Sequence, residues 1–355
     1  MFDLALPCRA LPCRALPGLD PTSTLTNICT TPTRSAIRTE ALRRTFNEVT
    51  AVDGIDLDIS TGEIYGFLGP NGAGKTTTLR MLCTLLTPTS GSASVAGFDV
   101  ANQPGEVRLR IGVALQEAAL DPKQTGAELL RLQGLLYGLP KSAMPQRVRE
   151  LGELMDLSDA LDRRIETYSG GMKRRLDLAA ALVHNPDILF LDEPTTGLDP
   201  ISRNTVWEEI DRLNRELGMT ILLTTQYLEE ADLLANRVGI IDRGKLVAEG
   251  TPAELKRSVG ADVIVARVDG DASGAVDAVR AVEGVKDVEV HGNELLVTTT
   301  AGSATISPVA VALSQCEASV RDLTLRTPTL DDVFLELTGS RIEILSTAGD
   351  EEASP

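Results

Sequence analysis

The stretch GPNGAGKT, which runs from Gly69 to Thr76, decides the fold class of this chain. Two glycines five positions apart, followed directly by Lys and Thr, form the pattern of a phosphate-binding loop. Glycine lets successive backbone N–H groups converge on one anion, and the following helix points its positive N-terminal end at the same charge. Lys75 supplies a cation for the outer phosphates, and the hydroxyl of Thr76 can hold Mg²⁺.

The residues on either side of this loop supply the setting that the pattern requires. Residues 63–68 are a short, mostly apolar run of strand length, and residues 77–82 have helical character. A strand, a glycine loop and a helix in that order predict an α/β fold of the P-loop NTPase class, which binds a nucleotide.

The second half of a nucleotide site follows much later in the chain. Residues 188–191 are wholly apolar, as in a strand of a parallel sheet covered on both faces, and Asp192 and Glu193 come directly after them. Open α/β sheets bind ligands at the carboxyl ends of their strands, so we expect both carboxylates beside the glycine loop. Asp192 is then placed to orient Mg²⁺ beside Thr76, and Glu193 to polarise an attacking water.

Between these two elements lies a run of small residues, Tyr168-Ser169-Gly170-Gly171-Met172, before a predicted helix at 172–182. A Ser and two glycines at a helix start can form a second phosphate cradle, although a glycine turn with an N-capping Ser would look the same. With this run the chain resembles the ATP-binding-cassette (ABC) ATPases, whose signature is usually Leu-Ser-Gly-Gly-Gln. The chain departs from that signature at its first and last positions and keeps the Ser-Gly-Gly core.

Further motifs of that family occur in the expected order. The resemblance implies that Phe46 stacks on adenine, that Gln116 reaches Mg²⁺ and links two subdomains, and that Asp199 belongs to the D-loop. Taken singly, Phe46 would be read as a core aromatic and Gln116 as a surface residue. The predicted nucleotide-binding residues are Phe46, Gly69, Pro70, Asn71, Gly72, Ala73, Gly74, Lys75, Thr76 and Thr77, with Mg²⁺ held by Thr76, Gln116 and Asp192.

One position departs from the family in a way that bears on catalysis. ABC ATPases usually carry His after the strand that is expected here at residues 220–225, and this chain has Gln226. Gln can donate and accept hydrogen bonds, but it cannot hold a charge or shuttle a proton. The surrounding run, residues 224–232, resembles the daunorubicin-resistance branch of exporter ATPases. We therefore predict that Glu193, Gln226 and Gln116 are the catalytic residues. Gln226 in place of His bears on the rate of ATP hydrolysis and not on the binding of nucleotide.

Composition disfavours several other classes of protein. The chain has 355 residues, which suffices for two domains, and a net charge of −17. That charge argues against nucleic-acid binding and against direct adhesion to anionic lipid. No run approaches the roughly 20 apolar residues of a membrane span, so we expect any pore to belong to another polypeptide.

The sequence divides into five predicted parts. Residues 1–35 contain a Pro-rich five-residue repeat, and we expect a disordered tail or upstream sequence included by a misplaced start. Residues 36–258 are assigned to the ABC ATPase domain, with a helical subdomain at about 117–167 inserted into it. Residues 259–340 are assigned to an accessory α+β domain, and residues 341–355 to a flexible acidic tail.

The accessory domain shows the order strand, helix, strand, strand, helix, strand, which matches the split βαβ arrangement. Its strands are expected at residues 262–268, 285–290, 295–299 and 319–325, and its helices at 275–282 and 309–314. A last helix should start near Thr329, with Asp332 completing a cap, and stop at Gly339. This end resembles that of drug-exporter ATPases, and we interpret the domain as a dimerisation module without a ligand.

The resemblance implies the ATPase subunit of an ABC exporter of the drug-resistance type, which uses ATP and Mg²⁺. Two copies would pair head to tail, so that Ser169, Gly170, Gly171 and Met172 of one copy close over the nucleotide of the other. The pair would drive a separate integral membrane permease, peripherally attached on the cytoplasmic side. Two alternatives stay open: a soluble ABC ATPase acting on ribosomes or DNA, and a regulatory dimer with little turnover, which Gln226 suggests. The sequence does not identify the cargo, because selectivity should reside mainly in the permease.

Overall fold

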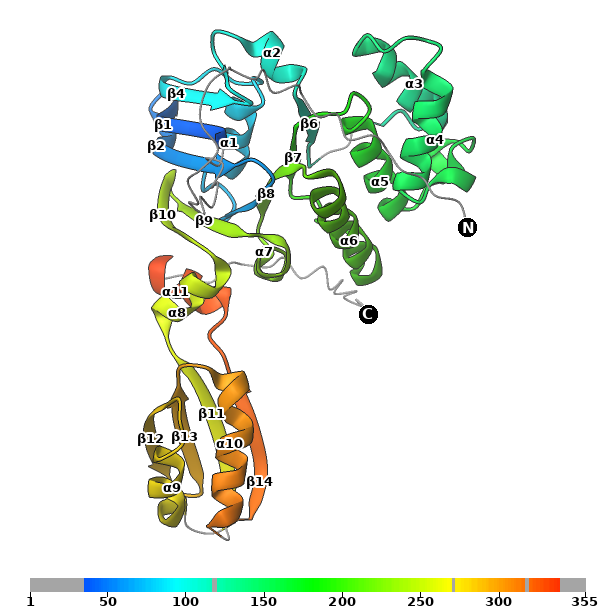
Figure 1. Cartoon of the computed structure of the whole chain (residues 1–355). Helices are drawn as coiled ribbons and strands as arrows, with labels where there is room; N and C mark the ends of the chain where they lie inside the picture. Colours follow the sequence, from blue (N-terminus) through cyan, green and yellow to red (C-terminus); the bar gives the residue numbers. More distant parts are fainter. Residues whose placement is uncertain (1–34, 117–119, 270–271, 317–318, 339–355) are drawn as a thin grey trace, which may run out of the picture. The chain divides into compact units, whose positions relative to one another are not determined.

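The structure is a computed structural model that describes residues 35–116, 120–269, 272–316 and 319–338. The two predicted tails therefore lie outside the described residues, apart from Ser35. The strands of the described part form three sheets, of which one is mainly parallel and two are antiparallel (Figure 1).

The mainly parallel sheet has the strand order β10-β9-β3-β8-β7-β6. Its strands are β3 (Ile64–Leu68), β6 (Ile111–Ala114), β7 (Ile188–Asp192), β8 (Thr220–Thr225), β9 (Arg237–Asp242) and β10 (Lys245–Gly250), with β10 antiparallel to β9. In β7, Ile188 and Phe190 pack into one core cluster, whereas Leu189 and Leu191 pack into another. The strand is wholly apolar up to Asp192 because both faces of the sheet are covered.

Helices surround this sheet and carry the motifs. They are α1 (Lys75–Leu82), α2 (Pro104–Arg108), α5 (Gly170–Ala181), α6 (Pro200–Leu217) and α7 (Leu228–Leu234). Between β6 and β7 the chain forms α3 (Gly126–Leu136), α4 (Met144–Leu154) and two short turns, η1 (Ser158–Ala160) and η2 (Ile165–Thr167). Both α3 and α4 pack against α5, so the insertion between these strands supports the helix that begins at the signature residues.

The second sheet is a four-stranded antiparallel sheet that the sequence analysis did not predict. Two of its strands precede the phosphate loop in the sequence, and two follow it. Its order is β2-β1-β4-β5, with β1 (Ser35–Phe46), β2 (Val49–Ser60), β4 (Ser90–Val95) and β5 (Phe98–Asp99). In β2, buried Ile55, Leu57 and Ile59 alternate with exposed aspartates. This period-two pattern is the signal of a half-buried strand, and it was available in the sequence.

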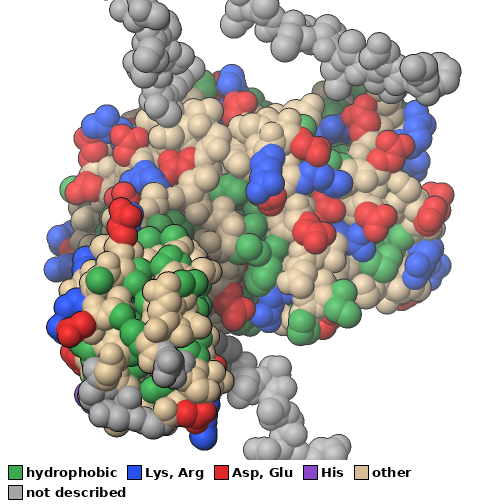
Figure 2. All heavy atoms as spheres, turned by 60° about the horizontal axis from the view of Figure 1, so that its bottom comes forward, with side chains coloured by type: hydrophobic (Ala, Val, Ile, Leu, Met, Phe, Trp, Pro, Cys, Tyr) green, Lys and Arg blue, Asp and Glu red, His purple; other side chains and the backbone are tan. Residues whose placement is uncertain are grey.

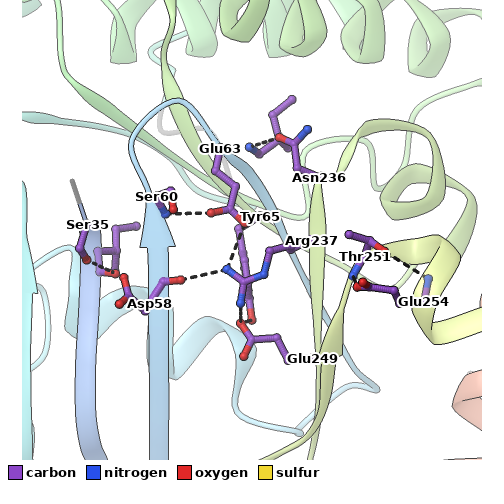
Figure 3. A network of polar contacts seen from close by, with 12 residues as sticks. Ser35, Asp58, Ser60, Glu63, Tyr65, Asn236, Arg237, Glu249, Thr251 and Glu254 are labelled. Atoms are coloured by element: carbon purple, nitrogen blue, oxygen red, sulfur yellow. Dashed lines mark hydrogen bonds and ion pairs between the residues drawn. The ribbon is translucent and has the colours of Figure 1, made fainter. Parts of the chain in front are cut away.

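A network of polar contacts centred on Arg237 joins the antiparallel sheet to the parallel one (Figure 3). The guanidinium donates to the carbonyl oxygen of Asp58 at 3.0 Å and to the carboxylates of Glu63 and Glu249. Tyr65 donates its hydroxyl to the same Glu249 carboxylate at 3.0 Å, and burial raises the pKa of Tyr65, so it stays a donor at neutral pH. These contacts fix β3, which leads into the phosphate loop, against its neighbours.

The C-terminal part contains the third sheet, with the antiparallel order β12-β13-β11-β14. Its elements are β11 (Asp262–Val268), η3 (Ala272–Ala275), α9 (Val276–Arg280), β12 (Val285–His291), β13 (Glu294–Thr299), α10 (Gly302–Gln315) and β14 (Val320–Arg326). The expected split βαβ arrangement is confirmed. Helix α10 begins well before residue 309, where the sequence placed it, and Pro308 lies inside it.

Two further helices stand before and after this sheet in the chain. They are α8 (Pro252–Val259) and α11 (Leu330–Thr338), and they pack against each other. Helix α8 starts with a capping box of Thr251 and Glu254, and the expected cap of Thr329 with Asp332 is confirmed at the start of α11. The predicted stop at Gly339 lies outside the described residues.

The surface of the described residues carries both signs of charge. Asp and Glu side chains alternate with Lys and Arg over the face drawn in Figure 2, so that face presents no field of a single sign. Within the ranges that the structure describes, no helix has the length and apolar character needed to cross a membrane.

Candidate active site

The phosphate loop is held in a conformation that only glycine adopts easily. Gly74 has φ of 110°, and a Cβ there would lie 2.5 Å from the carbonyl oxygen of Ala51 on β2. Lys75 begins α1, and its buried ammonium donates to the carbonyl oxygens of Gly69 at 2.8 Å and Pro70 at 3.2 Å. Burial lowers the pKa of Lys75, although Glu193 and Asp192 oppose that shift. The loop therefore presents a partly desolvated cation at the carboxyl end of β3.

The end of β7 brings two predicted metal ligands together. The hydroxyl of Thr76 donates to Oδ1 of Asp192 at 3.1 Å, and the hydroxyl of Thr224 donates to the same oxygen at 2.6 Å. Hydroxyl and carboxylate oxygens are the ligand types that Mg²⁺ prefers. Clusters of three or more His, Cys, Asp or Glu side chains that could hold a metal alone are absent from the described ranges. The residues present thus fit a metal ion that takes its remaining ligands from phosphate and water.

Glu193 is the most constrained residue of the site. Its φ is +47°, in the left-handed region that non-glycine residues rarely adopt, and its side chain is buried. The carboxylate lies 3.7 Å from the ammonium of Lys75 and accepts hydrogen bonds from Gln116 at 3.3 Å and from Thr196 at 3.2 Å. The structure therefore brings together Lys75, Gln116 and Glu193.

Gln226 directly follows β8, on the side of the sheet where Asp192 ends β7. The strand register pairs Thr224 of β8 with Asp192 of β7. Gln226 therefore lies two residues beyond the residue of β8 that is paired with Asp192. Its residue is 7% exposed, and its side chain makes no hydrogen bond to a described residue. The amide is thus held near the end of β7 with its hydrogen-bonding groups uncommitted.

Phe46 lies at the end of β1, where it pairs with Val49 at the start of β2. Its ring is 42% exposed, and the guanidinium of Arg44 lies 4.6 Å from the ring centre. Two residues after Val49, β2 reaches the phosphate loop, since the carbonyl oxygen of Ala51 lies against Gly74. Phe46 is therefore not a core aromatic, and it can offer a free ring surface to a planar group.

The signature residues stand at the start of α5, where Ser169 and Gly170 are exposed, Met172 is half-buried and Gly171 is buried. Ser169 accepts a hydrogen bond from the backbone N–H of Met172 at 3.2 Å. A Cβ at Gly171 would lie 2.8 Å from the hydroxyl of Ser202, which itself donates to Asp199 at 2.6 Å. The signature and the D-loop thus contact each other within one chain. Among the described residues, no hydrogen bond joins Ser169 to the phosphate loop.

Two buried charged residues near Glu193 were missed by the sequence analysis. Arg174 on α5 donates to the carbonyl oxygens of Leu115 at 2.7 Å and Pro194 at 2.8 Å, and it pairs with Asp177 at 3.1 Å. Glu230 on α7 is 0% exposed. Both stand in charged runs that resemble exposed helix faces, so nothing in the sequence marked them as buried.

Comparison with known proteins agrees with this geometry. A family described as "ABC transporter" matches residues 52–196, and one described as "ATP-binding protein DrrA1-3-like, C-terminal domain" matches residues 250–338. The chain is 47% identical to the daunorubicin/doxorubicin resistance ATP-binding protein DrrA of Streptomyces peucetius, over 91% of this chain and 98% of that protein. It is 37% identical to the linearmycin resistance ATP-binding protein LnrL of Bacillus subtilis, over 85% of this chain and 98% of the relative.

A solved structure has the same fold. It is described as the ATP-binding subunit of an ABC transporter, is 26% identical in sequence and superposes with a TM-score of 0.57. The superposition covers 63% of this chain and 93% of the other.

Proposed function

The chain belongs to the family of DrrA-like ATP-binding proteins of ABC transporters, and we propose that it hydrolyses ATP to power export of a drug or similar amphipathic compound. The observation that carries this proposal is the arrangement at the end of β7. Glu193 is held between the Lys75 ammonium and the Gln116 amide, while Asp192 shares its carboxylate with Thr76. Two relatives are named as daunorubicin/doxorubicin and linearmycin resistance proteins, and these names support a role in drug export.

Each residue has a distinct role in the proposed reaction. Lys75 neutralises charge on the outer phosphates, and Glu193 accepts the proton of the attacking water. Gln116 holds Glu193 in place, and Gln226 offers a hydrogen bond to the phosphate or to the water. Bound Mg²⁺, held by Thr76, Asp192 and Gln116, would neutralise the developing phosphate charge. Phe46 would stack on adenine.

We propose that a second copy completes the site. Ser169 and Gly170 lie exposed at the start of α5, where the backbone N–H groups and the helix dipole favour an anion. They make no hydrogen bond to this chain's own phosphate loop within the described ranges, and a head-to-tail partner would bring them to the nucleotide. The D-loop residue Asp199, which caps α6, contacts the signature through Ser202.

The remaining assignments follow from the same proposal. The partner in transport would be an integral membrane permease, with this chain bound peripherally on the cytoplasmic side. We propose that residues 36–258 form the ATPase domain, with the helical subdomain at about 117–167, and that residues 259–340 form the accessory domain. The interspersed charges of the visible surface weigh against a nucleic-acid partner (Figure 2).

The first prediction tests the catalytic assignment. Glu193→Gln should leave the Kd for ATP within about twofold and slow single-turnover hydrolysis by about 100-fold or more, because it removes the base and spares the phosphate cradle. Lys75→Ala should weaken ATP binding itself. Nucleotide titration and single-turnover assays on purified protein measure both. Hydrolysis by Glu193→Gln at the parental rate would show that the base lies elsewhere.

A regulatory dimer with little turnover is the second candidate, and the buried Gln226 favours it. Measured turnover separates the two functions: a parent protein that binds ATP and closes into a dimer without hydrolysis supports the regulatory one. Copurification with an integral membrane protein that stimulates hydrolysis supports the exporter.

A further inference from the structure

Glu230 is a buried carboxylate on α7 that contacts two other segments next to predicted site residues. It lies on α7, four residues after Gln226. Its Oε1 accepts a hydrogen bond from the hydroxyl of Thr195 at 2.9 Å and another from the indole N–H of Trp207 at 2.9 Å. Thr195 lies two residues beyond Glu193, and Trp207 lies on α6, the helix that Asp199 caps. One oxygen atom therefore joins the segments that follow Glu193, Gln226 and Asp199.

A second buried charge holds the same loop from another helix. Arg174 on α5 donates to the carbonyl oxygen of Pro194 at 2.8 Å and to that of Asp192 at 3.4 Å. Burial lowers the pKa of Arg174 and raises the pKa of Glu230, and the opposite charge of each residue opposes the shift of the other. Residues 192–195, which include the strained backbone of Glu193, are thus held by hydrogen bonds to Arg174 of α5 and to Glu230 of α7.

The chemistry of Glu230 argues for more than packing. A fully buried carboxylate costs desolvation free energy that an apolar side chain of similar size would avoid. Burial accordingly raises the pKa of Glu230, although its hydrogen bonds and Arg174 oppose this. What the carboxylate supplies, and an apolar residue cannot, is one acceptor for two donors on different segments.

We propose that Glu230 is a positioning residue for ATP hydrolysis, which locks the loop of Glu193 to the helix that follows Gln226 and to the helix that follows Asp199. The proposal rests on the ATPase function above. A displacement of α7 together with Gln226 is then passed to Glu193 through Thr195, and to the D-loop helix through Trp207. Glu230 touches neither substrate nor metal ligand, so its effect should fall on the rate and not on nucleotide affinity.

The test compares Glu230→Gln, Glu230→Ala and the matched control Glu229→Ala, which alters the exposed neighbouring carboxylate on the same helix. Glu230→Ala should slow single-turnover hydrolysis by roughly 10- to 100-fold, as expected for small displacements of a catalytic group. Its Kd for ATP should stay within about twofold of the parent. Glu230→Gln retains a carbonyl oxygen for both donors and should recover most of the rate. Glu229→Ala should behave as the parent.

A second readout does not depend on hydrolysis. Trp207 is the single tryptophan of the chain, so its fluorescence reports directly on the Glu230 contact. Addition of a non-hydrolysable ATP analogue should change the emission in the parent and in Glu230→Gln. The change should be absent in Glu230→Ala at saturating analogue, because the link between α7 and α6 is gone.

Two milder variants keep the proposal testable if Glu230→Ala does not fold. Thr195→Val and Trp207→Phe each remove one donor and preserve most of the packing. Thr195→Val should slow hydrolysis, and it should add little to the defect of Glu230→Ala, since both changes break the same contact. If both mild variants hydrolyse ATP at the parental rate, the positioning role is wrong.

Two outcomes with Glu230→Ala would also overturn the proposal. One is hydrolysis at the rate of Glu229→Ala with an unchanged melting temperature. The other is a parallel loss of ATP binding, hydrolysis and melting temperature, which marks Glu230 as structural only. Failure of the proposed function itself looks different, because the parent protein would then show no hydrolysis.

Discussion

Gln226 occupies the position where this family usually has His, a residue that can carry a charge and transfer a proton. It is buried beside the end of β7. A carboxamide can align a water or a phosphate through hydrogen bonds, but it cannot relay a proton. In the proposed mechanism Glu193 would then take the proton unaided, and its contacts with Lys75 and Gln116 support that proposal. The sequence identified these residues because the motif spacing is rigid, whereas Arg174 and Glu230 were hidden in charged helical runs.

The second prediction concerns Gln226. Gln226→His should be tolerated, and Gln226→Ala should slow hydrolysis more than it weakens ATP binding, because Ala leaves the polar site unmatched. Loss of one positioned donor commonly costs about 2.7–4 kcal/mol of transition-state stabilisation, and Lys75 should reduce that cost here. Single-turnover hydrolysis and nucleotide titration on the three proteins measure the effects. An unchanged rate in Gln226→Ala would make this side chain a bystander.

The pH–rate profile of the parent protein is a control for the assignment of Gln226, in place of His, to the site. The only two histidines are His184, which bonds to the carbonyl oxygen of Ile111 and stacks on Tyr137, and His291 on β12. Neither is among the site residues described above, so the parent should show no step near the roughly 6.5 of an unperturbed imidazole. Because the pKa of Asp177 is raised to about 6, a step in that range contradicts a site without histidine only if it persists in Asp177→Asn.

At the scale of elements, periodicity and capping identified most of what surrounds the site. The apolar strand β7 and the capped start of α11 appeared where the sequence placed them. The sequence placed the start of α10 at residue 309, directly after Pro308, whereas the helix begins at Gly302 and contains this proline, a residue that usually disrupts a helix interior. Its first turn forms nonetheless, since Thr305 is buried and bonds to the carbonyl oxygen of Ala301. Tertiary packing, which a single sequence does not reveal, decided that boundary.

The third prediction uses Asp177 on α5. Burial raises its pKa to about 6 against the opposing charge of Arg174, whereas an unfolded Asp titrates near 3.9. The folded state therefore binds the proton more tightly. The resulting stability is fully present below about pH 4 and is lost as the pH rises through about 6. The shift of about two pKa units corresponds to about 3 kcal/mol.

Asp177→Asn removes this titration. The free energy of unfolding of the variant, relative to the parent, should rise by about 3 kcal/mol or less between pH 4 and pH 7. Denaturant unfolding at several pH values measures it, with the exposed Asp187→Asn as control. Parallel curves for the parent and Asp177→Asn would show that Asp177 titrates alike in both states.

At the scale of the whole molecule, the last described helix packs on elements from much earlier in the chain. Leu330, Val333 and Phe334 of α11 share a core cluster with Leu228 of α7 and Leu255 of α8, together with Val238 and Ile240 of β9. The sequence predicted this helix and its cap. It could not predict the contact, because an amphipathic pattern shows which face is apolar and not what covers it. The domain boundaries assigned above stay a prediction.

The fourth prediction follows from that cluster. Phe334 is 1% exposed, and Phe334→Ala should reduce the free energy of unfolding by about 3–5 kcal/mol, the usual cost of deleting a buried aromatic ring. Leu335→Ala is the matched control, since this neighbour on the same helix is 38% exposed and should cost about 0.5 kcal/mol or less. Hydrogen exchange locates the effect: amides of α7 and β9 should lose protection in Phe334→Ala and keep it in Leu335→Ala. If protection of α7 and β9 is unchanged in Phe334→Ala, α11 does not stabilise the elements that follow Gln226.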